Sequence, residues 1–221
     1  MIELDLLTLK REAATFIQTI SHKPLPTLFG VNDGKTVGTL IEQTFRTALK
    51  ERGYTFAEGN SASGIDFPSL GVDLKVTSIQ QPQSSCPFRS AEQKVYGLGY
   101  HLMIFVYRKT DHPLEKYTTL EFVHAVFIDR ERTADYQLTS LLIRELNNGA
   151  NSEEIAALLA DRNLPLDDDQ RYRLAERILQ SPPNIGYLTI SNALQWRLQY
   201  QRAIDTAEKA GVAGVESILS L

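Results

Sequence analysis

One uninterrupted apolar run limits the folds open to this chain. Residues 100–107 read Tyr-His-Leu-Met-Ile-Phe-Val-Tyr and contain no charged side chain other than one histidine. A run of this length and composition is typical of a strand buried on both faces in the centre of a sheet. A second apolar run at 120–128 predicts another buried strand, after a charged loop at 108–116.

Helical patterns precede these strands. Residues 5–21 have apolar side chains at mainly helical spacing, and 36–52 carry a regular i, i+3, i+4 stripe that stops before a glycine. Two short strands follow, at 54–56 and within 64–78, and then a helix from Ala91 with Ser90 and Gln93 at capping-box spacing. This order indicates a mixed α/β core and not a βαβ repeat.

The remainder of the chain is predicted to be mainly helical. Thr133 and Ser152 are suited to cap two helices, and a third is expected at 168–180. A short strand at 185–190 and a long helix at 191–210 complete the pattern. We therefore expect an α/β (α+β) fold in which a mixed central β-sheet is flanked by helices, with a helical C-terminal region.

Composition excludes several classes of protein. The 221 residues are 43% hydrophobic and 23% charged, with no apolar segment long enough to cross a membrane. The acidic N-terminus is unlike a signal peptide, and the single Cys86 cannot form an internal disulfide, so we expect a cytoplasmic protein. The net charge of −4 weighs against a non-specific nucleic-acid binder, but a site-specific enzyme needs only a local basic cleft.

The residues best suited to chemistry lie at 64–78. Asp73 and Lys75 alternate with apolar neighbours, so on a strand both project from one face. The segment Pro-Ser-Leu-Gly at 68–71 predicts a turn that folds Asp66 back toward Asp73. Two carboxylates and one ammonium would then meet at one edge of a sheet.

The pattern acid-x-Lys alone is not specific. It also occurs at Asp33-x-Lys35, in a turn before a helix, and at Glu92-x-Lys94, in the first turn of a helix. Only Asp73-x-Lys75 combines a strand with a further acid seven positions upstream. Two other interpretations stay open, namely a surface ion pair without function and a site that joins Asp73 to Glu92 and Lys94.

The residue types at 64–78 suit magnesium-dependent cleavage of phosphodiesters. Mg²⁺ prefers oxygen ligands and is usually held by one or two carboxylates, which Asp66 and Asp73 would supply with the carbonyl of Leu74. Lys75 would lie near the attacking water and the phosphate. Glu42, on the flank of the helix at 36–52, would hold a second metal or its water shell. Mn²⁺ is expected to substitute for Mg²⁺.

These motifs resemble a known family. Asp66 and Asp73-x-Lys75 are similar to the PD-(D/E)XK active site of type II restriction endonucleases. The sequence around these residues is most similar to that of the MutH-like nucleases. The segment Gly38-Thr-Leu-Ile-Glu42 resembles the upstream helical motif of those nucleases, and their further lysine would fall on Lys94. The resemblance covers roughly 36–107. It departs from the family at Ile65, where proline is usual, and at Asp73, where glutamate is commoner.

The resemblance implies a restriction-endonuclease-like fold and a Mg²⁺-dependent, sequence-specific endonuclease of double-stranded DNA. A single nuclease domain would span 1–221, with a catalytic core at about 36–130 and a mainly helical subregion at about 133–221. A homodimer would suit palindromic sites, and a DNA methyltransferase would be its genetic partner. The alternatives are a MutH-like nicking enzyme of mismatch repair and a non-catalytic DNA-binding module of the same fold.

Recognition of DNA is expected from polar and basic residues outside the catalytic strand. Their side chains are of the types that contact base edges and phosphates. An equally open interpretation is a polar loop and a solvated helix face. The candidates are Gln80, Gln81, Gln83, Ser84, Ser85, Arg89, Lys94, Asn192, Arg197, Gln199 and Arg202.

Overall fold

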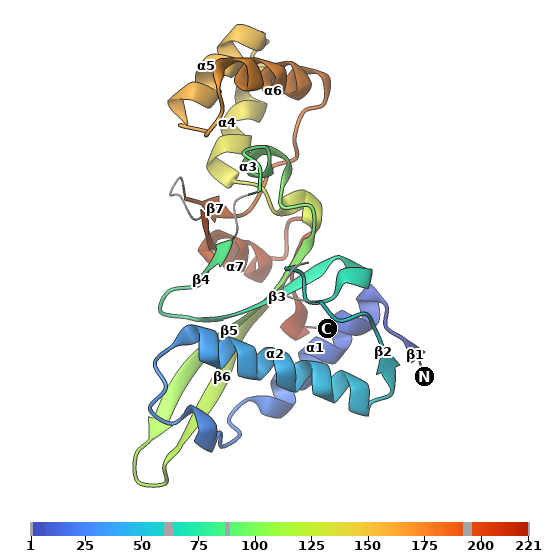
Figure 1. The fold of residues 1–221 in the computed structure, drawn as a ribbon, viewed down its shortest axis with the longest axis vertical. Helices are drawn as coiled ribbons and strands as arrows, with labels where there is room; N and C mark the ends of the chain where they lie inside the picture. Colours follow the sequence, from blue (N-terminus) through green and yellow to red (C-terminus); the bar gives the residue numbers. More distant parts are fainter. Residues whose placement is uncertain (1, 60–63, 87–88, 192–195, 221) are drawn as a thin grey trace. The chain divides into compact units, whose positions relative to one another are not determined.

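Figure 1 shows the computed structural model of the chain, which describes residues 2–59, 64–86, 89–191 and 196–220. The chain divides into two compact units, each built from segments that are distant in sequence. The first unit comprises Met1–Gln83, His101–Ile128 and Ile204–Leu221, and the second comprises Ser84–Tyr100 and Asp129–Ala203.

A four-stranded sheet forms the centre of the first unit. Its order is β3 (Val72–Ser78), β5 (His101–His112), β6 (Tyr117–Ile128) and β9 (Val215–Ser217). β3 runs parallel to β5, whereas β6 is antiparallel to both β5 and β9, so the sheet is mixed. The prediction of a mixed α/β fold with two long buried strands is confirmed.

The predicted loop at 108–116 is mostly strand. β5 continues to His112 and β6 already begins at Tyr117, so the two strands extend together as a hairpin beyond the buried part of the sheet (Figure 1). Across this extension, Arg108 Nη1 donates to Glu121 Oε2 at 2.7 Å. Charged side chains on exposed strands pair with each other across the ladder, and this keeps the extension ordered where composition indicated a loop.

Helices α1 (Leu6–Ile20) and α2 (Gly34–Glu51) pack into the same core as the sheet. Aspartates cap both helices, since the side chains of Asp5 and Asp33 accept the N–H groups of the first turns. Three phenylalanine rings join the layers, with centroid distances of 4.9 Å for Phe16–Phe45 and 5.8 Å for Phe45–Phe105. At one side, β1 (Ile2–Glu3) and β2 (Tyr54–Thr55) form a short parallel pair.

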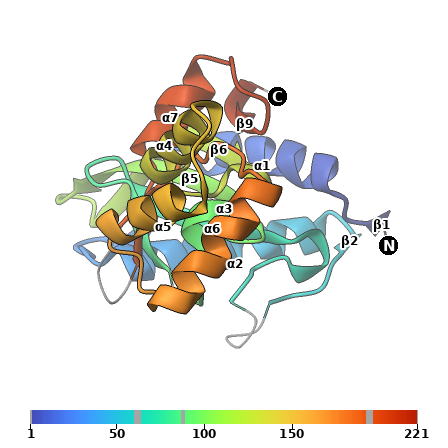
Figure 2. The same cartoon turned by 90° about the horizontal axis from the view of Figure 1, so that it is seen from above.

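The second unit is mainly helical. Its helices are α3 (Gln93–Tyr96), α4 (Tyr136–Asn147), α5 (Ser152–Asp161) and α6 (Asp168–Gln180), and α6 has the predicted bounds. α5 and α6 lie side by side in both views (Figure 1 and Figure 2). A small sheet accompanies them, in the order β4 (Gln83–Cys86), β8 (Trp196–Gln199) and β7 (Thr189–Ile190). Within the described ranges, no helix is long and apolar enough to cross a membrane.

The predicted long helix at 191–210 is wrong. The chain instead forms β8 and then the eight-residue α7 (Gln201–Glu208), and 192–195 lie outside the described residues. In β8, Trp196 and Leu198 are buried and the residues between and after them are exposed, which is the two-residue period of a strand. Pairing with β4 and β7 therefore overrides a spacing that also fits a helix.

Three predicted helix starts are also wrong in detail. Ser90 accepts the N–H of Glu92 and not that of Gln93, so no capping box forms and α3 is only four residues long. Asp135, not Thr133, caps α4, and Asn151 caps α5. The Thr133 hydroxyl instead accepts the Leu98 N–H at 2.9 Å and donates to the Arg130 carbonyl at 2.7 Å, which ties two loops together.

Candidate active site

β3 positions an aspartate and a lysine side by side. Val72 and Leu74 are completely buried in the core of the first unit, so Asp73 and Lys75 alternate onto the other face of the strand. The Lys75 Nζ atom lies 2.9 Å from Asp73 Oδ2. β3 ends the sheet on this side, with β5 as its parallel neighbour.

A tight turn returns Asp66 to the same place. The chain forms a 3-10 turn at Pro68–Leu70, and Gly71 takes the left-handed conformation with φ 61°. Phe67 and Val72 then exchange two backbone hydrogen bonds of 2.9 and 3.2 Å. Asp66 stands just before this isolated bridge, not on a strand, and its Oδ2 accepts the N–H of Leu74 at 2.8 Å.

Helix α2 contributes a third carboxylate and a guanidinium. It lies against β3 (Figure 1), and Glu42 and Arg46 are four residues apart on it, so they share one face of the helix. Arg46 Nη2 donates to Asp66 Oδ1, and Glu42 interacts electrostatically with Asp66, Lys75 and Arg46. Arg46 is not among the predicted site residues, although its position one turn after Glu42 was a usable signal.

Burial makes two carboxyl groups of this cluster, those of Asp73 and Glu42, hard to ionise. Burial raises the pKa of Asp73 to about 7, and the neighbouring Asp66 adds to the rise while Lys75 opposes it. Burial and then Asp66 raise the pKa of Glu42 to about 7 as well. For Lys75 burial lowers the pKa, but Asp73, Asp66 and Glu42 together raise it above its ordinary value. A further cation at this site would relieve the repulsion among the carboxylates.

The donor set fits Mg²⁺ through two carboxylates. In the part of the chain that the structure describes, no three His, Cys, Asp or Glu side chains are already gathered as a ligand group. Asp66 and Asp73 do adjoin, since the Asp66 carboxyl is among the causes that raise the pKa of Asp73. Mg²⁺ commonly uses only one or two carboxylates and completes its shell with water and phosphate oxygens.

The two competing acid-x-Lys matches have other structural roles. Asp33 caps α2 and accepts the N–H groups of Lys35 and Thr36 at 3.1 and 3.0 Å. Glu92 belongs to the second unit, where its Oε2 accepts a hydrogen bond from Arg177 Nη1 at 2.6 Å.

Three of the predicted DNA-contacting residues belong to the first unit with the cluster. Gln80 and Gln81 lie in the turn after β3, and Gln83 is half-buried at the start of β4. The backbone N–H of Gln83 donates to Thr77 Oγ1 at 3.2 Å, and this bond closes the turn. Their side-chain contacts with DNA stay predictions.

The other predicted DNA-contacting residues, apart from Asn192, belong to the second unit. Lys94 is buried, its pKa is lowered by burial, and its Nζ lies 6.0 Å from the centroid of the Trp196 ring. Arg202 stacks on Tyr136, with 3.7 Å from guanidinium carbon to ring centroid. Asn192 lies outside the described residues. The Ser84 hydroxyl forms a hydrogen bond with the Tyr200 hydroxyl. Ser85, Arg89 and Arg197 are exposed.

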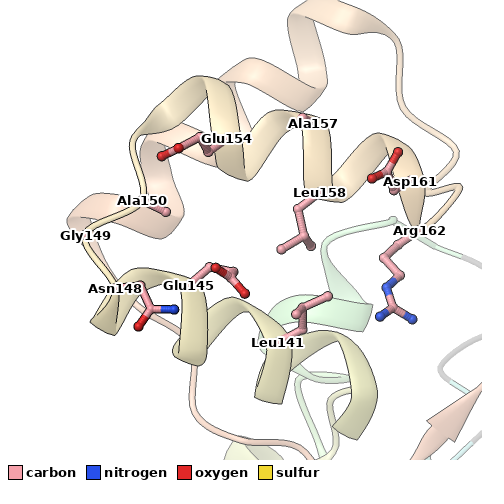
Figure 3. A pocket seen from close by; sticks show the side chains of 10 residues that line it. All are labelled: Leu141, Glu145, Asn148, Gly149, Ala150, Glu154, Ala157, Leu158, Asp161 and Arg162. Atoms are coloured by element: carbon pink, nitrogen blue, oxygen red, sulfur yellow. The ribbon is translucent and has the colours of Figure 1, made fainter.

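A cavity of about 760 Å³ in the second unit lies between α4 and α5 (Figure 3). None of the predicted site residues lines it. Its walls are apolar at Leu141 and Leu158, and its rim carries Glu145, Glu154 and Asp161. Three carboxylates against the single guanidinium of Arg162 leave the lining negative, and negative charge repels the DNA backbone, so this cavity is unsuited to hold phosphates.

Comparison with known proteins identifies the family. The family model described as Type II restriction enzyme NspV matches residues 3–217. A curated protein of that name from Nostoc sp. (strain ATCC 29411 / PCC 7524) is 54% identical over 207 residues, which cover 94% of each chain. No solved structure matches the chain. Because the family match and the relative both cover nearly the whole chain, the protein belongs to the NspV family of type II restriction enzymes.

Proposed function

We propose that this enzyme is a Mg²⁺-dependent, sequence-specific endonuclease of double-stranded DNA whose active site is of the PD-(D/E)XK kind. Family membership supports an endonuclease of the restriction type. One observation carries the choice of site. Asp66, Asp73 and Lys75 adjoin at one end of β3, where the turn at Pro68–Leu70 brings an acid back onto the strand.

Each side chain of the cluster has a distinct task in this proposal. Asp66 and Asp73 would hold Mg²⁺, with the Leu74 carbonyl as a further oxygen and Glu42 on the outer side. When bound, Mg²⁺ lowers the pKa of its water and neutralises charge on the phosphate. Lys75, held beside Asp73, would place its ammonium against the scissile phosphate and stabilise the charge that develops there. Asp73 would release its proton as the cation binds, because its pKa lies near 7 without one.

DNA is the proposed partner, and its bases would be read outside the cluster. Gln80 and Gln81 directly follow the catalytic strand and expose amide groups, which suit the edges of adenine. The remaining contacts would come from Gln83, from Asn192 and from residues of the second unit, namely Ser84, Ser85, Arg89, Lys94, Arg197 and Arg202. A cognate DNA methyltransferase would protect the host sites.

A plasmid assay tests the proposal. Purified protein and Mg²⁺ should convert supercoiled plasmid to linear DNA, and omitting the metal should stop the reaction. Lys75→Ala should reduce cleavage by roughly 10³-fold or more, because charge stabilisation at the phosphate is lost, and should leave DNA binding measurable.

Lys35→Ala is the matched control, since Lys35 belongs to a competing acid-x-Lys match and its side chain is exposed. It should cleave like the unchanged enzyme. Normal cleavage by Lys75→Ala would show that the site is misplaced. Open-circular product would favour the nicking alternative, and no product with Mg²⁺ or Mn²⁺ would contradict the proposed activity.

A further inference from the structure

Both oxygens of Asp66 already have donors from the chain. Arg46 Nη2 donates to Oδ1, and the Leu74 N–H donates to Oδ2 at 2.8 Å. Each carboxylate oxygen has two lone pairs, so a divalent cation can still coordinate Asp66 beside these donors, but at Oδ1 it meets the positive charge of Arg46. The backbone N–H of Leu74 is fixed within β3, whereas the Arg46 side chain can change its rotamer. Arg46 is therefore the donor whose charge opposes a cation and whose side chain can move away from it.

Arg46 is placed by charge more than by its own hydrogen bonds. Its side chain is only 20% exposed, and its Nε atom is buried without a hydrogen-bond partner in the structure. A buried N–H without an acceptor costs stability. The guanidinium faces more than one carboxylate, since it acts electrostatically on Glu42 and Glu58 as well as pairing with Asp66. Its position compensates negative charge that would otherwise be concentrated at this end of β3.

A purely structural role would be redundant. The Leu74 N–H already fixes Asp66 to β3, and α2 is anchored in the core by Val37, Ile41 and Phe45, each about 1% exposed or less. The Arg46–Asp66 pair adds little to either attachment. Its contribution is a positive charge beside Asp66, the carboxylate that the proposed function assigns to the metal.

We propose that Arg46 is a built-in counter-ion, which neutralises Asp66 in the metal-free enzyme and whose positive charge opposes the binding of a divalent cation at Asp66. This inference rests on the proposed function, because it requires Asp66 to be a metal ligand. Arg46 is a positioning residue in this scheme and not a catalytic one. Its charge sets how tightly the enzyme holds a divalent cation before DNA binds.

Direct titration with Mn²⁺, followed by electron paramagnetic resonance without DNA, tests the inference. Arg46→Met should bind Mn²⁺ about tenfold more tightly than the unchanged enzyme, because one repelling charge has been removed. Arg46→Lys should bind like the unchanged enzyme. Arg46→Gln, which keeps a hydrogen-bond donor without the charge, repeats the test if Arg46→Met does not fold.

Arg52→Met is the control variant. Arg52 is the C-cap of α2 and, like Arg46, pairs with a carboxylate, but its partner Glu12 is on α1 and outside the cluster. Arg52→Met removes the same charge, but at a position outside the cluster where solvent screens it. The Mn²⁺ affinity should therefore stay within about twofold of that of the unchanged enzyme. In EDTA at pH 8, Arg46→Met should unfold several degrees lower than Arg52→Met, and Mn²⁺ should remove that difference.

The outcomes separate the inference from the function on which it rests. Equal or weaker Mn²⁺ binding by both Arg46→Met and Arg46→Gln overturns the inference and leaves the proposed function intact, provided that the unchanged enzyme binds Mn²⁺ and cleaves. If the unchanged enzyme neither binds Mn²⁺ nor cleaves with a divalent metal, the proposed function and the inference both fail.

Discussion

At the residue scale, ionisation of the buried carboxyl of Asp73 makes the stability of the protein depend on pH. Its side chain is only 4% exposed, and its pKa of about 7 lies above the ordinary value of 3.8. The folded protein therefore binds more protons than the unfolded chain between these two values. Stability contributed by this group is lost as the pH rises through that window. Without a bound cation, ionisation of Asp73 therefore lowers the free energy of unfolding.

Asp73→Asn should remove this pH dependence. Relative to the unchanged enzyme in EDTA, the free energy of unfolding of Asp73→Asn should rise by about 2–3 kcal/mol between pH 5 and pH 8, since the amide does not titrate. Chemical denaturation at several pH values measures it. The relevant quantity is the change with pH, because the variant also loses the contact with Lys75.

Asp111→Asn is the control for this experiment. Hydrogen bonds from Lys109 and Thr118 lower the pKa of Asp111, so its contribution is lost only as the pH falls below its ordinary pKa. Its stability relative to the unchanged enzyme should not vary between pH 5 and pH 8. If Asp73→Asn is equally flat, Asp73 is ionised in the metal-free enzyme and the electrostatic account of the cluster is wrong.

At the scale of elements, a glycine at the end of α3 fixes how the following loops pack. Gly97 has φ +88°, and a Cβ there would lie 2.7 Å from the Arg130 carbonyl oxygen and 2.8 Å from Thr133 Oγ1. Gly97→Ala should therefore cost roughly 3 kcal/mol of unfolding free energy. Gly149→Ala, with φ +86° but no atom within 4 Å of its Cβ, should cost about 1 kcal/mol. Equal costs in thermal or chemical unfolding would contradict the predicted clash.

Gly38 on α2 should behave in the opposite way. A Cβ there would make ordinary contacts, 3.8 Å to the Val76 carbonyl oxygen and 3.9 Å to Glu42 Oε1. Gly38→Ala should stabilise the enzyme by about 0.5–1 kcal/mol, because alanine loses less backbone entropy in a helix. Gly38→Leu would push into β3 and Glu42 and should reduce plasmid cleavage. Wild-type cleavage by Gly38→Leu would mean that α2 and β3 need not approach closely for activity.

At the scale of the whole molecule, the proposed cleavage of both DNA strands at a palindromic site requires two equivalent active sites. The described part of each chain has one cluster of Asp66, Asp73 and Lys75, so we expect a homodimer on palindromic DNA. Sedimentation velocity of the enzyme with a cognate duplex should give the mass of two chains per duplex. One chain per duplex, together with linear plasmid product, would exclude this arrangement.

The sequence by itself determined most of the local elements and pointed to the residues of the candidate site. Each of these patterns follows from the period of a single element, as in the stripe on α2, the apolar runs of β5 and β6 and the alternation on β3. Such a period can be recognised in the sequence without knowing which distant residues pack against the element. The same holds for the turn that returns Asp66, since Pro68 and Gly71 favour it locally.

Only the tertiary structure decided what depends on neighbours distant in sequence. Trp196 lies in a strand because β8 pairs within a sheet, although its spacing with Tyr200 also fits a helix. Arg46 reaches Asp66 across twenty residues, and burial by the surrounding core raises the pKa of Asp73. Pairing, long-range contacts and desolvation are set by the packed core as a whole. No pattern confined to a single element contains them.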